Sequence, residues 1–223
     1  MLYDKEITVK RKYSPDALKA SKKRYFMMKR LMDFIGAFCG IIVLSPIFLV
    51  VAFLIKMESP KEAVFFKQVR IGKNSQQFYM FKFRSMCSDA EEKLTELLKD
   101  NEIEGAMFKI KDDPRVTKIG KFIRKTSIDE LPQLWNVLKG DMSLVGPRPP
   151  LPMEVEKYTE YDKQRLSVTP GCTGLWQISG RNHLSFHQMV ELDLEYIEHV
   201  SIMNDVKILS KTVKVVFGSD GAF

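Results

Sequence analysis

The longest apolar stretch of the chain covers residues 34–55, about 22 positions without a charged side chain. A straight helix of that length, at about 1.5 Å per residue, is about 33 Å long and crosses the hydrocarbon core of a membrane. Ser45-Pro46 lies in the middle of the stretch. An internal proline removes one helical hydrogen bond at a cost of about 3 kcal/mol. The pattern therefore indicates either a kinked span or a re-entrant hairpin that turns back at Ser45-Pro46.

Basic residues flank this stretch on both sides. They are Lys10, Arg11, Lys12, Lys19, Lys22, Lys23, Arg24, Lys29 and Arg30 before it, and Lys56, Lys61, Lys67 and Arg70 after it. Because lysine and arginine concentrate on the cytoplasmic side, the charges favour a re-entrant helix with both ends in the cytoplasm. A single-pass anchor with a proline kink stays open as an alternative. A soluble core helix or a cleaved signal peptide fits less well, because the stretch is too long and begins too far from Met1.

Weaker periodic patterns predict the remaining elements. Residues 21–33 are typical of an amphipathic helix at a membrane interface. Residues 63–71 and 77–86 predict a β-hairpin, and the loop between them, residues 72–76, contains Gly and Asn suited to positive φ. Further helices are predicted over residues 88–98, 116–125, 153–166, 185–200 and 202–217. The last of these carries Ile202, Val206, Leu209, Val213 and Val216 on its apolar face.

Length and composition bound the architecture. The 223 residues, 45% hydrophobic and 28% charged, fit one domain of ordinary size plus a membrane element. We expect an α+β, mainly helical fold with a small β-hairpin. Its parts are a basic arm with an interfacial helix (residues 1–30), a re-entrant membrane helix broken at Ser45-Pro46 (residues 31–56), and a cytoplasmic domain that ends in an amphipathic helix (residues 57–223).

The net charge of +7 and the isoelectric point of about 9.2 suit an anionic partner. Since many of the cations stand next to the apolar stretch, anionic lipid headgroups are the favoured partner for them. Nucleic acid is not expected, because no nucleic-acid-binding motif is found. The cysteines are few and scattered, and neither they nor the histidines have metal-ligand spacing, so we expect reduced thiols and no zinc site.

The acidic pair Asp129-Glu130 is the main candidate for chemistry. Ser127 and Glu130 have the spacing of a capping box, so structural capping of a helix is one interpretation. The functional alternative uses the same placement, because a helix N-terminus stabilises an ionised carboxylate. An ionised aspartate can attack phosphorus. Two adjacent carboxylates can also hold Mg²⁺ together with substrate phosphates.

Several basic residues stand in turns or at helix ends near this pair. They are Arg115, Arg124, Arg148 and Arg181. A guanidinium in such a place is suited to gripping phosphate oxygens. In the second predicted strand, Lys82 and Arg84 share one face, which is either a solvated face or an anion-binding face turned toward a cleft.

The run RKTSIDELPQLWNVLKGDMSLVGPRP, residues 124–149, resembles the bacterial sugar transferases. These are the monotopic polyprenyl-phosphate phosphoglycosyl transferases that start exopolysaccharide, capsule and O-antigen synthesis. The resemblance extends from about residue 29 to the C-terminus. It is carried further by KRLMDFIGAF, VFFKQVRIG, FKFRSM, DDPRVTKIGKFIRKTS and PGCTGLWQISGRN.

The resemblance implies a reaction. A UDP-sugar gives its sugar-1-phosphate to undecaprenyl phosphate, and UMP is released. By position, Asp129 is the expected nucleophile and Glu130 its Mg²⁺-binding partner. The expected phosphate-binding residues are Arg124, Arg148 and Arg181, with Lys82, Arg84 and Arg115 as weaker candidates. The resemblance also implies a re-entrant membrane element broken at Ser45-Pro46.

The resemblance further implies a monotopic protein on the cytoplasmic face of a bacterial cell membrane, in the minimal form of the family. Glucose or galactose is the expected sugar, and later glycosyltransferases and a second copy of the chain are expected partners. Where the family often has Trp, this chain has Val200, so membrane contact of the last helix is less strongly indicated. A membrane scaffold without enzyme activity and a hydrolase that transfers to water are the alternative functions.

Overall fold

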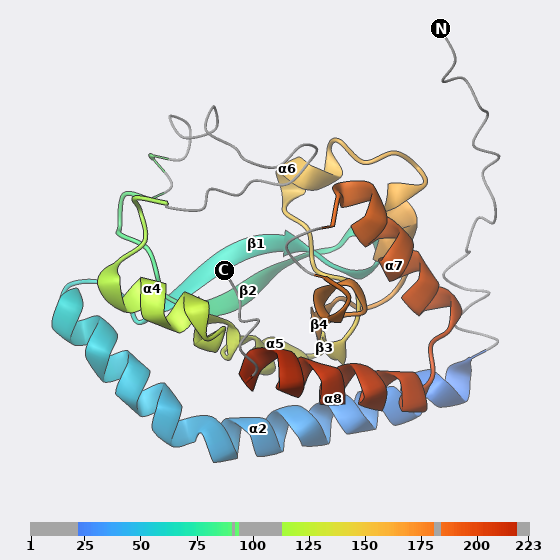
Figure 1. Ribbon diagram of the computed structural model, residues 1–223, viewed down its shortest axis with the longest axis horizontal. Coiled ribbons are helices and arrows are strands. Elements are labelled where there is room, and N and C mark those ends of the chain that lie inside the picture. The colour runs from blue at the N-terminus through green and yellow to red at the C-terminus, as the bar shows by residue number, and fades with distance from the viewer. Residues whose placement is uncertain (1–21, 91, 94–112, 181–183, 218–223) are drawn as a thin grey trace, which may run out of the picture.

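The computed structural model of the protein describes residues 22–90, 92–93, 113–180 and 184–217. One long bent helix, α2 (Lys23–Glu58), forms one border of the molecule, and the other elements lie on its inner side (Figure 1). Those elements are two small sheets and several short helices. The α+β, mainly helical class predicted from the sequence is confirmed. The predicted basic arm, residues 1–21, lies outside the described residues.

Helix α2 is continuous over 36 residues and contains Pro46. Figure 1 shows that it bends between its two halves. Ser45 Oγ donates to the Ile42 carbonyl at 2.7 Å. This carbonyl is the one that the missing amide hydrogen of Pro46 leaves without its helical donor. The hydroxyl of Ser45 thus replaces the lost bond, and the predicted break is a bend within one helix rather than a turn between two.

The outer side of α2 is apolar and exposed. Among the described residues, α2 is the one helix long and apolar enough to cross a membrane. Its exposed large apolar side chains include Met27, Leu31, Phe34, Phe38, Ile42, Val43, Leu49, Val50 and Phe53. A contiguous apolar surface of this extent is far larger than monomeric soluble proteins expose. The surface is therefore consistent with contact between α2 and lipid.

The first half of α2 is held on its inner side by polar contacts with α8 (Ile202–Phe217). Lys29 and Asp205 are both buried and form an ion pair at 2.9 Å. Tyr25 and Tyr196 also donate to the Asp205 carboxylate, each at 2.8 Å. The interface helix predicted over residues 21–33 is in fact the first turns of α2. The assignment of its cations to lipid headgroups is wrong for Lys29, which is buried in protein.

Arg30 and Asp33 extend this attachment to the centre of the domain. Arg30 donates to the carbonyls of Val137 and Leu138 at 2.6 and 2.7 Å, at the end of α5 (Gln133–Lys139). Asp33 accepts the amide of Leu144 at 3.0 Å in β3 (Ser143–Val145). The guanidinium of Arg30 therefore binds the carbonyl groups at the C-terminal end of α5, where a cation is favoured, and not a lipid headgroup.

Both ends of α2 bind the same domain. At the N-terminal end, Lys22 Nζ donates to the Glu198 carbonyl at 3.0 Å, where α7 (Phe186–Glu198) ends. At the C-terminal end, the Glu58 carboxylate accepts the amides of Lys118 and Ile119 at 2.9 and 3.1 Å. These amides begin α4 (Lys118–Lys125), whose N-terminus favours an anion.

The predicted hairpin is confirmed. Strands β1 (Phe65–Ile71) and β2 (Gln77–Phe83) pair antiparallel. In the turn between them, Asn74 has φ of 54°, as predicted, whereas Gly72 has φ of −106° and the second positive φ, 61°, is at Ser75. The amide group of Asn136 bonds to the free edge of β2, accepting from Phe81 N at 2.9 Å and donating to Tyr79 O at 2.7 Å. Helix α5 and the hairpin are thereby fixed to each other.

A second sheet joins β3 to β4 (Gly171–Thr173) in parallel. Gly171 packs so closely that a Cβ there would lie 2.0 Å from the amide nitrogen of Gly146. The loop of residues 146–150 leaves β3 at this point, and Gly171 N donates to the Pro147 carbonyl at 2.8 Å. The main core, beside this sheet, contains Val145, Val190, Leu194, Ile197 and Ile208 from β3, α7 and α8.

Two predicted helices need correction. Residues 153–166 form a short helix α6 (Pro152–Val155), a turn and a 3₁₀ helix η4 (Asp162–Ser167), because the Asp162 carboxylate accepts both the amide and the hydroxyl of Thr159 and stabilises the turn. The described part of residues 88–98 is a turn, and the rest lies outside the described residues.

The bounds predicted for the last helix are confirmed, but its predicted apolar face is wrong in part. In α8 the buried side chains are Asp205 and Ile208, whereas Val206 and Val213 are 46% and 57% exposed. The ion pair with Lys29 turns Asp205 inward and so sets the rotation of the helix.

Replacement of Asp205 tests the attachment of α2. Asp205→Ala leaves Lys29 buried without its counter-ion, so we expect a loss of about 3–5 kcal/mol in the free energy of unfolding. Denaturant unfolding of the protein in detergent measures this loss. Glu160→Ala, which removes an exposed ion pair with Lys163 at 2.8 Å, is the control and should change stability by less than about 0.5 kcal/mol. Equal effects of the two substitutions would contradict the assigned role of Asp205.

Candidate functional site

The acidic pair lies in a 3₁₀ turn, η3 (Ile128–Glu130), between α4 and α5. Ser127 precedes the turn with φ of 54°, a left-handed conformation, and its side chain makes no capping hydrogen bond. The Glu130 carboxylate instead accepts from Lys82 Nζ of β2 at 2.7 Å. The capping-box interpretation of Ser127 and Glu130 is therefore wrong.

Asp129 is buried, with 7% of its surface exposed. Burial raises its pKa to about 6; Lys82 and Arg124 oppose the rise, and the Glu130 carboxylate adds to it. A helix N-terminus was predicted to stabilise the ionised carboxylate, which would lower its pKa. The pKa is raised instead, because η3 is a short turn inside the protein. At neutral pH the carboxylate is still mainly ionised. It is a poorly hydrated anion beside two cations, which suits a nucleophile.

The residues that flank the acidic pair share an apolar cluster with helix α2. Ile128 and Leu131, which flank the acidic pair, pack on a cluster that contains Val51 and Ile55 of α2. The cluster therefore links the acidic turn to the second half of α2, the half that follows the bend at Pro46.

A second group of cations comes from the loop of residues 146–150 and from β1. The Arg148 guanidinium lies 3.3 Å from the buried Glu154 carboxylate, and its side chain is 25% exposed. Arg70 donates to the carbonyl of Pro149 at 2.9 Å. Burial and the nearby Arg148 lower the pKa of Arg70 to about 9, while Glu154 and Glu130 oppose the change. The charges of Arg148, Glu154 and Glu130 therefore all act on Arg70.

Sequence reasoning assigned no site role to Arg70. The strand pattern contained a usable signal, because Arg70 pairs with Phe78 and Lys82 pairs with Phe66 in the hairpin. In an antiparallel hairpin, directly paired residues lie on the same face of the sheet, and so do residues two positions apart along one strand. Arg70 and Lys82 therefore lie on the same face.

The other predicted phosphate-binding residues are not all near the pair. Arg115 is buried, bonds the Asp113 carboxylate at 2.6 and 2.9 Å and donates to the Ala90 carbonyl at 3.0 Å, which favours a structural role. Arg84 donates to the Ala63 carbonyl at 2.8 Å, at the start of the hairpin. Arg124, in the last turn of α4, is close enough to lower the pKa of Asp129. Arg181 lies outside the described residues.

The donor set of the acidic pair is compatible with Mg²⁺. Within the described ranges no group of three or more His, Cys, Asp or Glu side chains is placed to hold a metal ion. Asp129 and Glu130 offer hard carboxylate oxygens, one of which already accepts from Lys82. Mg²⁺ commonly binds one or two carboxylates and takes its other oxygens from substrate phosphates and water. The residues therefore fit a metal ion that is shared with a phosphorylated substrate.

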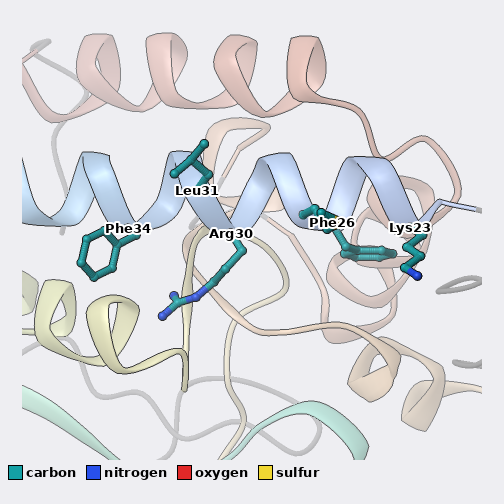
Figure 2. Close-up of a pocket in the computed structure, with 6 residues that line it drawn as sticks. Lys23, Phe26, Arg30, Leu31 and Phe34 are labelled. Atoms are coloured by element: carbon teal, nitrogen blue, oxygen red, sulfur yellow. The ribbon is translucent and has the colours of Figure 1, made fainter.

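An open groove of about 630 Å³ runs along the first half of α2. Figure 2 shows Lys23, Phe26, Arg30 and Phe34 on one side of the helix and Leu31 on the other. All of the residues that line the groove belong to α2, and none belongs to the surroundings of Asp129. The groove is therefore separate from the candidate active site.

Comparison with known proteins identifies the class. A sequence model of the family described as bacterial sugar transferase matches residues 24–219. The chain belongs to this family, which confirms the resemblance found in the sequence.

Relatives with assigned names agree with this class. The galactosyl transferase CpsE of Streptococcus agalactiae serotype III is 50% identical over 208 residues, which are 92% of this chain and 46% of the relative. An undecaprenyl-phosphate galactose phosphotransferase of Salmonella typhimurium is 42% identical over 91% of this chain and 43% of its own length. The exopolysaccharide production protein ExoY of Sinorhizobium fredii is 42% identical over 87% of this chain and 88% of its own. The chain thus spans less than half of the first two relatives.

The raised pKa of Asp129 predicts a pH-dependent stability effect. The pKa is about 6 in the folded protein against an ordinary 3.8, so the ionised carboxylate reduces stability above about pH 6, and the reduction disappears as pH falls toward 4. Asp129→Asn should therefore raise the free energy of unfolding at pH 7.5 by up to about 3 kcal/mol. Urea unfolding between pH 4 and 8 measures the gain. Glu156→Gln, at an exposed site, should show none, and a loss of stability in Asp129→Asn at pH 7.5 would contradict the assignment.

Proposed function

We propose that the protein transfers a sugar-1-phosphate from a UDP-sugar to undecaprenyl phosphate, as the first membrane step of exopolysaccharide, capsule or O-antigen synthesis. The observation that supports this most strongly is the placement of Asp129. It is a buried carboxylate under the electrostatic influence of Lys82 and Arg124, and the residues that flank the acidic pair share an apolar cluster with helix α2. A site for an anionic soluble donor and a lipid acceptor needs this combination.

In the first step, an ionised oxygen of Asp129 attacks the phosphorus that carries the sugar. The bond from that phosphorus to the bridging oxygen breaks, and UMP leaves with this oxygen. Lys82, Arg124 and Arg148 lower the repulsion between the carboxylate and the diphosphate. Arg181 is retained as a predicted phosphate-binding residue.

In the second step, a phosphate oxygen of undecaprenyl phosphate attacks the phosphosugar on Asp129. The bond between phosphorus and the aspartate oxygen breaks, which restores the carboxylate and gives undecaprenyl diphosphate sugar. Because UMP leaves before the lipid reacts, one small site serves both substrates in turn.

Glu130 and Asp129 are the proposed ligands of Mg²⁺. When bound, the ion would neutralise charge on the diphosphate and on the leaving UMP. Glu130 holds Lys82 at 2.7 Å, so it also orients this ammonium group beside the nucleophile.

The proposed topology is monotopic and re-entrant, with the domain on the cytoplasmic face of a bacterial membrane. Its support is that both ends of α2 bind the same domain, through Lys22 and through Glu58. A helix that fully crossed the bilayer would hold its ends on opposite sides, so it would lose one of these contacts. Anionic lipids remain proposed partners for the exposed cations near Lys23.

Cysteine labelling tests the topology. The native cysteines, Cys39, Cys87 and Cys172, are free and can be replaced by serine. Single cysteines are then introduced by Lys23→Cys and Lys61→Cys, at exposed positions near the two ends of α2. An impermeant maleimide should label neither in intact cells and both in inverted vesicles. Labelling of one of them in intact cells would show a single span and contradict the re-entrant proposal.

Galactose is the sugar we propose first, and glucose second. Three relatives carry galactose or galactosyl in their names, at 50%, 43% and 42% identity, while a relative from Aeromonas hydrophila named for N-acetylgalactosamine is 40% identical. Later glycosyltransferases of the pathway and a second copy of the chain are proposed partners.

Release of UMP tests the function. The purified protein, UDP-galactose and undecaprenyl phosphate should give UMP and a lipid-linked sugar in equal amounts, with UDP-glucose as the second donor. Asp129→Asn should lower turnover by at least about 10³-fold, whereas Asp141→Asn, on the loop after α5, should retain it. Continuous UMP release without the lipid would indicate a hydrolase. No UMP release with any UDP-sugar would indicate a membrane scaffold.

A further inference from the structure

Arg70 is a buried arginine without an acidic partner. Its side chain is 6% exposed, and Nη2 and Nε donate to Gln68 Oε1 at 2.7 and 3.1 Å. Nη1 donates to the Pro149 carbonyl at 2.9 Å. In the part of the chain that the structure describes, no carboxylate lies within 4.0 Å of this guanidinium. Burial of a charge without a counter-ion is strongly unfavourable. A buried arginine such as Arg70 is therefore expected to have a function that offsets this cost.

Arg70 hydrogen-bonds to the loop of residues 146–150. Residues 147, 149 and 150 are prolines, which have no amide hydrogen, so the backbone of the loop around Arg148 is held mainly through its carbonyls. The carbonyl of Pro149 accepts from Arg70, and the carbonyl of Pro150 accepts from Ile71 N at 2.9 Å. The end of β1 therefore fixes the backbone on the C-terminal side of Arg148.

The charge of Arg70 also acts on the proposed active site. Arg70 and Lys82 share one face of the hairpin, and Lys82 bonds Glu130. Arg148 repels Arg70, while Glu154 and Glu130 attract it. A diphosphate held by Arg148 would relieve the repulsion between the two arginines. A bound diphosphate would thus add negative charge near Arg70, which has no carboxylate in direct contact.

We propose that Arg70 is a positioning residue for the phosphosugar transfer: it holds the loop of residues 146–150 and thereby the position of Arg148, and its positive charge, which no contacting carboxylate neutralises, strengthens binding of the diphosphate. This inference rests on the proposed function and adds a residue to it. Arg70 acts from inside the protein through Arg148 and the loop, and does not itself touch the substrate.

Gln68→Glu separates this role from a purely structural one. The substitution is nearly isosteric and gives Arg70 a carboxylate partner in place of an amide. A purely structural arginine would keep its contacts and the protein would be at least as stable. Under the proposal, the new carboxylate neutralises Arg70, and the dissociation constant for UDP rises about tenfold because one favourable charge near the diphosphate is cancelled.

The experiment measures UDP binding by calorimetry in the Asp129→Asn background, where no transfer occurs. Gln77→Glu is the matched control: it makes the same chemical change in the same hairpin, but residue 77 pairs with Ile71 and lies on the opposite face from Arg70. It should change the dissociation constant less than twofold. A thermal melt checks that each variant is folded.

The outcomes distinguish the two proposals. Weaker UDP binding in Gln68→Glu, with unchanged thermal stability and an inert Gln77→Glu control, supports the role of Arg70. Unchanged UDP binding in Gln68→Glu overturns that role and leaves the proposed transfer intact. If the protein binds no UDP at all, both the proposed function and the role of Arg70 are overturned.

Discussion

Helix α2 has an apolar outer side, and polar contacts hold its inner side against the domain. In the first half the buried ion pair of Lys29 with Asp205 provides the attachment, and at the far end Glu58 binds the first amides of α4. Since both attachments belong to one domain, the bend at Pro46 lies between two fixed ends. The exposed apolar surface of α2 and the acidic turn, whose flanking residues share a cluster with Val51 and Ile55, are consequently held in one fixed relation.

Electrostatics at the acidic turn follow from that position. Burial raises the pKa of Asp129 to about 6, and Lys82 and Arg124 oppose the rise, so that the carboxylate is mainly ionised near neutral pH. The site therefore contains a poorly hydrated anion, the Asp129 carboxylate. It also contains lysine and arginine side chains whose positive charge the neighbouring carboxylates neutralise only in part. Such a site is unfavourable for stability, and it suits an anionic phosphorylated substrate.

Local patterns predicted much of the fold. The hairpin, α7 and α8 were found because strand alternation and helical periodicity are encoded in neighbouring residues. Residues 153–166 were misassigned because the turn at Thr159 depends on one side-chain contact from Asp162. The acidic pair stays a prediction as the site of chemistry, but the burial of Asp129 was not foreseen, since burial depends on tertiary packing and not on neighbouring residues.

Long-range contacts were beyond the reach of the sequence. The pairing of Lys29 with Asp205 joins residues 176 positions apart, and nothing local marks either residue as buried. Arg70 was overlooked for the same reason, because its bond to Pro149 crosses 79 positions. Cations that looked like a solvated or lipid-facing set are in part structural, as Lys29, Arg30 and Arg115 show.

The central claim is that Asp129 forms a covalent bond to the phosphosugar. Its most direct test is the intact mass of the protein after incubation with UDP-galactose in the absence of undecaprenyl phosphate, followed by peptide mapping. The account predicts an added mass of one hexose phosphate on the peptide that contains Asp129, and its loss when undecaprenyl phosphate is supplied. Normal turnover with lipid but no adduct without it, or an adduct on another residue, would contradict the account.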